Sequence, residues 1–162
     1  MDASVLGLAA AGAVLGFSAI GSAFGTGYAG MSAVGSWKKC YTQDKPAPFS
    51  LMIFVGAPMT QTLYGYILFR SIVALSEKMA DAGAGIFENF TKDPFSLLMM
   101  GCMFAGFAIG ASALFQGKVA AACADALAET GKGMAYYLMV VGVVETVALL
   151  VMVFMLITLG KF

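Results

Sequence analysis

Glu145 is the residue with the clearest potential for chemistry. It lies in the run VVGVVETVALLVMV, and from Gly133 to Gly160 no other residue is charged. If this run crosses a membrane, a charge near the midplane costs about 3 kcal/mol even on the mildest insertion scales. Glu145 must therefore meet a proton, a metal cation, a basic partner or a water-filled path, or else be a structural glutamate bonded between packed helices.

A second group of polar residues lies on one face of another apolar segment. At about 100° per residue, Thr60, Gln61 and Tyr64 fall within an arc of about 100° on a helix, and Ala57 falls in the same arc. Pro58 stands in that turn and lacks a backbone N–H, so it bends the helix and leaves a carbonyl without its helical partner. Loosened carbonyls beside polar side chains are typical of a cation site in a membrane helix.

Gln116, in a third apolar segment, adds another amide. Together the carboxylate, two amides, a hydroxyl and a backbone carbonyl form an oxygen-only set with one negative charge, which fits a hard monovalent cation best. Divalent cations prefer more negative charge, and transition metals prefer His or Cys. There is no histidine, and we interpret the scattered Cys40, Cys102 and Cys123 as ordinary small residues. If Glu145 bound only a proton, the neutral oxygens would not be needed as ligands. The alternative for each polar residue is an interhelical hydrogen bond worth about 1 kcal/mol.

Composition identifies the elements that must position these residues. Apolar residues make up 60% of the chain and charged residues 11%, whereas about a quarter of the residues of a soluble domain are charged. We therefore predict an all-α membrane protein of four helices, each with the roughly 20 apolar residues needed to span. The zero net charge implies no nucleic-acid partner. The charge-free stretches are Ala3 to Trp37, Pro46 to Phe69, Pro94 to Gly117, and Gly133 to Gly160 interrupted only by Glu145.

The sequence repeats itself. GFSAIGSAFGTG, from Gly16, aligns with GFAIGASALFQG, from Gly106, and PMTQTLYGYI aligns with GVVETVALLV in the following helices. We predict two helical hairpins, residues 1–80 and 81–162, duplicated in parallel. The alignment places Gln61 opposite Glu145 and Thr26 opposite Gln116, so one carboxylate serves four helices.

Small residues recur on one side of the first and third helices, and such residues allow close backbone approach in membranes. The second and fourth helices are bulky instead. We expect the thin helices to form an inner layer and the bulky ones to face lipid, although glycine enrichment is also general in membrane helices. The two sets are Gly16, Ala23, Gly27 and Gly30, and Gly106, Ala113, Gly117 and Ala120.

An even number of spans places both chain ends on one side. The first and third connections carry five basic residues and the other side carries four, an asymmetry that favours a cytoplasmic location for the first and third connections.

Three motifs together resemble a known family. PMTQTLYG (Pro58 to Gly65), FQGKVAAA (Phe115 to Ala122) and VET (Val144 to Thr146) are similar to the duplicated rotor-ring proteolipid of bacterial V-type (A/V-type) ATPases, particularly the sodium-transporting kind. The resemblance covers nearly the whole chain.

The resemblance implies a homo-oligomeric ring of about ten subunits in the plasma membrane. It also implies a stator subunit whose arginine faces the ion-binding glutamate, and a central stalk on the cytoplasmic side. Each subunit would carry one Na⁺, coupled to ATP hydrolysis or synthesis by other subunits. A proton-carrying rotor and a small ion-coupled transporter are the alternatives. This chain has no phosphate-binding loop, so we expect no catalysis in it. The implied site consists of Glu145, Gln116, Gln61, Thr60, the backbone carbonyl of Ala57, and Tyr64 as a hydrogen-bond donor to Glu145.

Overall fold

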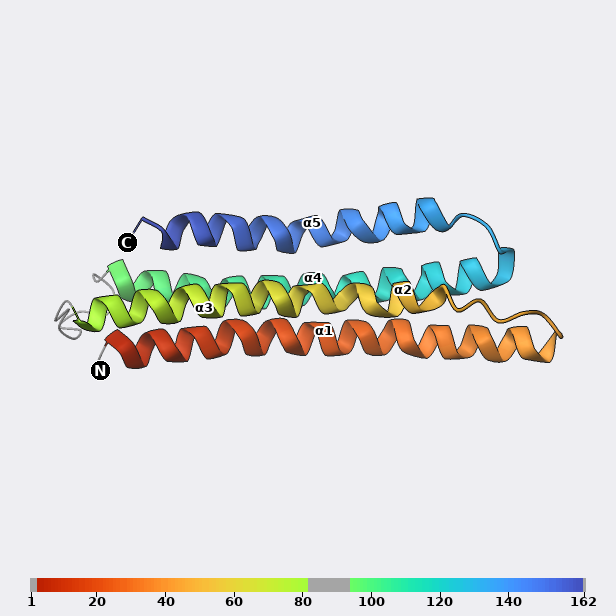
Figure 1. The fold of residues 1–162 in the computed structure, drawn as a ribbon, viewed down its shortest axis with the longest axis horizontal. Helices are drawn as coiled ribbons and strands as arrows, with labels where there is room; N and C mark the ends of the chain where they lie inside the picture. The colour runs from red at the N-terminus through yellow and green to blue at the C-terminus, as the bar shows by residue number, and fades with distance from the viewer. Residues whose placement is uncertain (1–2, 82–93, 162) are drawn as a thin grey trace.

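The computed structural model describes residues 3–81 and 94–161, and all regular structure within them is helical. Four segments are long and apolar enough to cross a membrane, which confirms the predicted fold class. They lie side by side as a long bundle, with Ala3 and Lys161 at the same end (Figure 1). The predicted hairpin boundary at residues 80–81 adjoins a connection outside the described residues and stays a prediction. The elements are α1 (Ala3–Thr42), α2 (Leu51–Gly56), the 3-10 helix η1 (Ala57–Met59), α3 (Thr60–Asp81), α4 (Pro94–Thr130) and α5 (Met134–Leu159).

The second spanning segment is interrupted where the sequence predicts a bend. α2, η1 and α3 follow one another without a gap, and together they form the span Leu51–Asp81. Pro58 occupies the short 3-10 turn between the two α-helices. Because proline cannot donate the hydrogen bond that continues an α-helix, the chain tightens locally at this point. This turn directly precedes Thr60 and Gln61.

Left-handed residues end two of the helices. α1 ends shortly before Asp44, which has a φ of 52°. After α4, Gly131 adopts a φ of 64° and its N–H donates to the carbonyl of Leu127 at 2.8 Å. Gly133, with a φ of 90°, then starts α5. Glycine takes these conformations without a Cβ clash. The resulting connection between α4 and α5 is short, so α5 folds back along α4.

α1 and α4 make the most extensive contact of the bundle. Glycines make it possible, because a Cβ at Gly117 would lie 2.2 Å from the Cα of Gly25, and a Cβ at Gly106 would lie 2.5 Å from the Cα of Val14. The two backbones therefore touch directly, as small residues permit in membrane helices. The expected close packing of the first and third helices is present within one chain.

The two stripes of small residues differ in their surroundings. The stripe of α4, Gly106, Ala113, Gly117 and Ala120, is buried, whereas α1 turns Gly16, Ala23 and Gly27 to the outside. α1 contacts α4 through Val14, Gly21 and Gly25 instead. The expected close approach through small residues is present for the stripe of α4, whereas within this chain α1 makes its close contact through a different face from the predicted one.

Among the four spans, α5 is the most exposed. Only 11% of its most apolar window is buried, compared with 50% for the α4 span. The bulky fourth helix therefore lies outermost in the single chain, and the prediction that it faces lipid stays a prediction.

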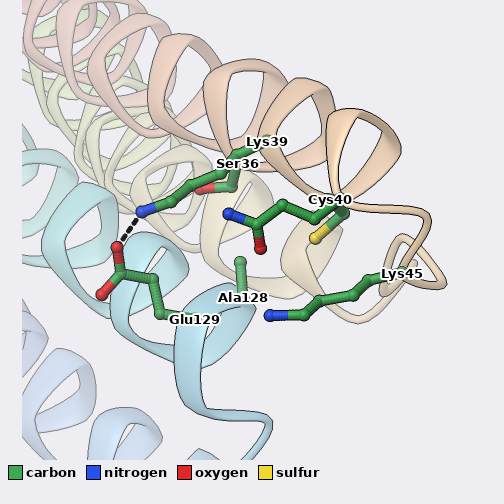
Figure 2. A pocket seen from close by; sticks show the side chains of 7 residues that line it. Ser36, Lys39, Cys40, Lys45, Ala128 and Glu129 are labelled. Carbon is green, nitrogen blue, oxygen red and sulfur yellow. Dashed lines mark hydrogen bonds and ion pairs between the residues drawn. The ribbon is translucent and has the colours of Figure 1, made fainter.

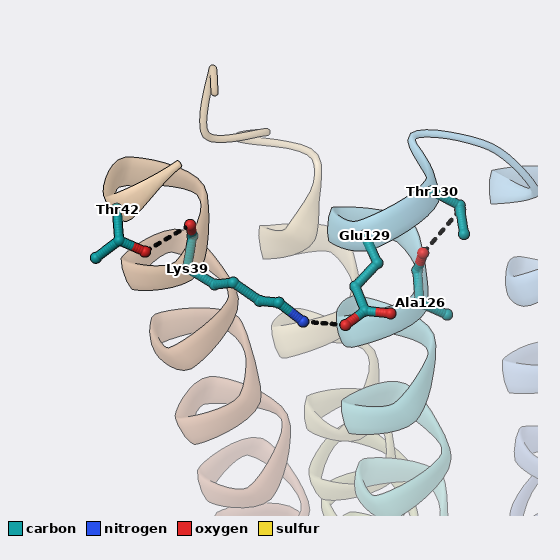
Figure 3. A network of polar contacts seen from close by, with 5 residues as sticks. All are labelled: Lys39, Thr42, Ala126, Glu129 and Thr130. Atoms are coloured by element: carbon teal, nitrogen blue, oxygen red, sulfur yellow. Dashed lines mark hydrogen bonds and ion pairs between the residues drawn. The ribbon is translucent and has the colours of Figure 1, made fainter. Parts of the chain in front are cut away.

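Polar side chains gather where α1 and α4 end. Lys39 forms an ion pair with Glu129 (Figure 3), the only such pair in the described part of the chain. Beside it lies a pocket of about 230 Å³ whose lining includes Cys40 and Lys45 (Figure 2). Both paired side chains are about half exposed, so the pair contributes little to stability. These ends lie beyond the charge-free stretches of α1 and α4.

The glycine contact gives the first prediction. Gly117→Ala places a methyl group against the backbone of α1, and we expect this overpacking to destabilise the protein by about 1–3 kcal/mol. Gly101→Ala in the same helix is the matched control, since nothing lies within 4 Å of its Cβ position and alanine favours the helix by up to about 1 kcal/mol. Thermal unfolding in detergent measures both. Equal melting temperatures for the two variants would contradict the direct backbone contact.

Candidate ion-binding site

The predicted polar residues lie at mid-length of the bundle, between two apolar clusters. One cluster includes Leu68 and Ile109, and the other includes Phe54 and Ala120. Gln61 and Gln116 are fully buried at 0% exposure. A buried amide requires hydrogen-bond partners because losing its hydration without compensation costs several kcal/mol. The contacts of these two glutamines therefore define the site.

The two amides bond to each other across the bundle. Gln61, from α3, donates through Nε2 to Oε1 of Gln116 in α4 at 2.7 Å. Gln116 in turn donates through Nε2 to the carbonyl of Val141 at 3.1 Å and to Oε2 of Glu145 at 3.4 Å. The sequence placed Gln61 and Gln116 in one site, and the structure brings them into direct contact.

Glu145 accepts hydrogen bonds from two helices. The hydroxyl of Tyr64 donates to Oε1 at 2.7 Å, and Nε2 of Gln116 approaches Oε2. Both donors are neutral, and the only ion pair in the described ranges 3–81 and 94–161 is the one between Lys39 and Glu129. Within those ranges Glu145 therefore has donors that orient its carboxylate but no basic side chain that balances its charge.

Two further oxygens lie beside the side-chain oxygen of Gln61. The hydroxyl of Thr60 lies 3.0 Å from the carbonyl of Ala57 and 3.1 Å from Oε1 of Gln61. The 3-10 turn at Pro58 creates this cluster, because it brings the carbonyl of Ala57 beside the first residues of α3. The single hydroxyl proton of Thr60 cannot bond fully to both the Ala57 carbonyl and Oε1 of Gln61. Lone pairs on these oxygens therefore remain available to a cation.

The structure thus brings together all six predicted site residues through one chain of hydrogen bonds: Ala57, Thr60, Gln61, Gln116, Glu145 and Tyr64. No group of three or more His, Cys, Asp or Glu side chains gathers in the residues that the structure describes. The donor set is therefore one carboxylate with neutral oxygens, which suits neither a transition metal nor a tightly held divalent cation.

Two contributors were missed from the sequence. The carbonyl of Val141 accepts from Gln116, and the hydroxyl of Ser112 donates to the carbonyl of Val144 at 3.1 Å. The internal repeat contains the signal for Val141, because the alignment of Gln61 with Glu145 also places Ala57 opposite Val141. Each hairpin thus presents a carbonyl to the site from the same relative position.

Four membrane-length helices with one partly buried carboxylate at mid-length define a small polytopic membrane protein of the proteolipid class. Comparison with known proteins makes the assignment specific. The ATP synthase C-subunit family matches residues 99–158, and the "A-type ATP synthase subunit K" of Methanocaldococcus jannaschii is 30% identical over 164 aligned residues. That alignment covers 95% of this chain and 66% of the relative's length. The chain belongs to this family of rotor-ring proteolipids of A/V-type ATPases.

The hydrogen bond to Glu145 gives the second prediction. Tyr64→Phe removes the donor at 2.7 Å, and a hydrogen bond to a charged group is worth about 1.5–3 kcal/mol. We expect the carboxyl to become less ordered and to react several-fold faster with a hydrophobic carbodiimide. The modification rate, followed by mass spectrometry of the peptide that contains Glu145, is the measurement.

Tyr66→Phe is the matched control for Tyr64→Phe, because Tyr66 is exposed and its ring stacks on Phe69 instead. Equal modification rates in the two variants would show that the hydroxyl of Tyr64 does not hold the carboxylate.

Proposed function

We propose that this chain is a membrane rotor subunit that binds one Na⁺ at Glu145 and carries it as the rotor turns, coupled to ATP hydrolysis or synthesis by other subunits. The observation that supports this most directly is the donor set. Glu145 has a single negative charge, no basic partner among the described residues, and neutral oxygens close by on α3 and α4.

The neutral oxygens near Gln61 favour a metal cation over a proton as the bound ion, because a proton on Glu145 would not need them as ligands. A carboxyl in an apolar pocket retains a proton without further ligands. Here Thr60, Gln61 and the carbonyl of Ala57 gather within about hydrogen-bond distance of one another. Rotation of the Thr60 hydroxyl and of the Gln116 amide directs lone pairs toward an ion held by Glu145. One carboxylate then neutralises one monovalent cation.

The proposed transport cycle is an exchange of charges at Glu145. With the ion bound, the site is neutral and can face lipid at low cost. At the stator the ion leaves, and an arginine of that subunit holds the carboxylate briefly. Tyr64 orients the carboxylate in both states, because its hydroxyl donates to the oxygen opposite Gln116.

The same proposal covers the assembly. Copies of the chain form a ring of about ten in the plasma membrane of a bacterium, and lipid surrounds the ring. The first and third connections face the cytoplasm and the central stalk. Nucleotide chemistry belongs to other subunits. The ring assembly of this proteolipid family supports the arrangement.

Protection by sodium tests the proposed ion. Carbodiimide should modify Glu145, and Na⁺ at millimolar concentration should slow the modification at mildly alkaline pH at least tenfold, while K⁺ at the same ionic strength should not. The reaction is followed in purified membranes. If the modification depended on pH but not on Na⁺, the carried ion would be a proton and not sodium. The assignment as a rotor subunit would be unaffected.

The neutral ligands give a separate prediction. Thr60→Val removes an oxygen of the cluster, and we expect the Na⁺ concentration that gives half-protection to rise about tenfold, which corresponds to about 1.4 kcal/mol of binding free energy. Thr146→Val is the matched control, because its hydroxyl bonds only to its own helix, at the carbonyl of Val143, and is exposed. Unchanged Na⁺ protection in Thr60→Val would remove Thr60 from the ligand set.

A further inference from the structure

α5 carries Glu145, and side-chain packing does little to fix the rotation of this helix about its axis. It lies at the edge of the bundle (Figure 1), and only three of its residues are buried: Val141, Ala148 and Leu159. Apolar side chains occur on all sides of α5. Because lipid gives apolar helices no hydrophobic drive to associate, a rotation exchanges one apolar face for another with little change in free energy. Other contacts must therefore set the rotation of α5.

The position of the Glu145 carboxylate is sensitive to that rotation. A side chain on an α-helix reaches about 5–6 Å from the helix axis, so a rotation of about 20° moves its end by about 2 Å. The hydroxyl of Tyr64 lies 2.7 Å from Oε1 of Glu145, and Nε2 of Gln116 lies 3.4 Å from Oε2. A displacement of about 2 Å can take either contact outside the range of a hydrogen bond. The geometry of the site thus requires a defined rotation of α5.

Two side chains of α4 bond to the backbone of α5 at the turn that carries Glu145. The hydroxyl of Ser112 donates to the carbonyl of Val144 at 3.1 Å. Nε2 of Gln116 donates to the carbonyl of Val141, also at 3.1 Å. The Val144 carbonyl belongs to the peptide bond with Glu145, and in an α-helix the Val141 carbonyl is the acceptor of the Glu145 N–H. These two bonds therefore hold the backbone of the carboxylate-bearing residue itself.

The donors form a straight row along α4. A third member, Cys123, places its Sγ 4.0 Å from the carbonyl of Tyr137. At about 100° per residue, Ser112, Gln116 and Cys123 lie within an arc of about 40° on α4. A thiol is a weak donor, and Tyr137 lies about two helical turns from Glu145. The stronger donors of the row are thus the two at the candidate site.

The equivalent row of the first hairpin makes no such bonds. In the repeat, Ser22 aligns with Ser112. Thr26 aligns with Gln116. The hydroxyls of Ser22 and Thr26 are buried and have no hydrogen-bond partner within the part of the chain that the structure describes. The row therefore joins two helices in the hairpin that carries Glu145, and this difference connects it with the carboxylate and not with hairpin packing in general.

We propose that Ser112 is a positioning residue of the ion site, which fixes the rotation of α5 so that Glu145 meets Tyr64 and Gln116. The hydroxyl of Ser112 is not a ligand, and it acts through the peptide bond between Val144 and Glu145. Ser112 is only 8% exposed, so its bond is shielded from competing water. This inference rests on the sodium site proposed above and adds a residue outside the ligand set.

Ser112→Ala tests this role through ion affinity. The Na⁺ concentration that half-protects Glu145 from carbodiimide should rise about threefold, which corresponds to about 0.6 kcal/mol of binding free energy, the average strength of an interhelical hydrogen bond in a membrane. Ser76→Ala is the matched control and should leave half-protection unchanged, because Ser76 is also buried but its hydroxyl bonds to its own helix, at the carbonyl of Ile72. Unchanged half-protection in Ser112→Ala would overturn the positioning role.

Cys123→Ala is the control within the same row. Its acceptor lies about two turns from Glu145, so this variant should keep the wild-type half-protection concentration. An equal rise in Cys123→Ala and Ser112→Ala would show that the row only packs α5 against α4, and it would overturn the specific role of Ser112.

Nuclear magnetic resonance separates a failure of this inference from a failure of the sodium site. Val144–Glu145 is the only Val–Glu pair in the sequence, so cell-free synthesis with carbonyl-¹³C valine and ¹⁵N glutamate labels a single peptide bond on both sides. In liposomes, Ser112→Ala should shift the carbonyl resonance of Val144 upfield, because the carbonyl loses a hydrogen bond, and Ser76→Ala should not.

The two measurements have distinct outcomes. An unchanged Val144 resonance in Ser112→Ala would overturn the bond and the positioning role, whether or not Na⁺ protects Glu145. A shifted resonance in a protein that Na⁺ never protects would overturn the sodium site and support the contact of Ser112 with the turn that carries Glu145.

Discussion

The structure depends on a carboxylate held in an apolar bundle by neutral donors alone. A basic side chain beside Glu145 would satisfy it permanently, at the cost of fixing its charge state. Tyr64 and Gln116 orient it without neutralising it. Other polar groups support this arrangement. Gln116 bonds to Gln61, Gln61 bonds to Thr60, and Thr60 bonds to the carbonyl that the 3-10 turn at Pro58 presents. Each of these groups would be costly to bury without such a partner. A carboxylate so placed is suited to exchange its counter-charge.

Duplication explains why two hairpins share one carboxylate. The second hairpin contributes Glu145 and Gln116, and the first contributes Gln61, in the position equivalent to Glu145, together with Thr60 and Tyr64. The first hairpin therefore carries a neutral amide at the equivalent position, and this amide donates to Gln116 of the second hairpin. The site of one chain thus contains one carboxylate, and a second charge at the position of Gln61 would repel it.

Much of this could be predicted from residue types and spacing. The four spans follow from the charge-free stretches, and the convergence of Thr60, Gln61 and Tyr64 follows from helical periodicity, since a helix fixes which side chains share a face. The bend at Pro58 follows from its missing N–H. α1 and α4 extend past their charge-free stretches, to Thr42 and Thr130, because short runs of charged residues do not by themselves end a helix.

The remaining features needed three-dimensional information. Periodicity shows that α1 has a small face around Gly16 and Gly27, but the partner of a face depends on how helices are arranged, and in one chain that face is open. The carbonyl of Val141 carries no residue signature, because every residue has a carbonyl. In the sequence, only the equivalence of Val141 to Ala57 in the repeat indicates a role for the Val141 carbonyl. The structure gives this equivalence a meaning, because Gln116 donates a hydrogen bond to that carbonyl.

The contact of α1 with α4 at Gly25 and Gly117 has a mechanical consequence. Where two backbones meet with no side chain between them, there is no rotamer to change and little soft material to compress. Any torque applied to one hairpin therefore passes to the other with almost no lag. The oxygens of Thr60, Gln61 and Gln116 bridge the two hairpins, so the stiffness of the glycine contact also helps to hold these oxygens at fixed distances from one another.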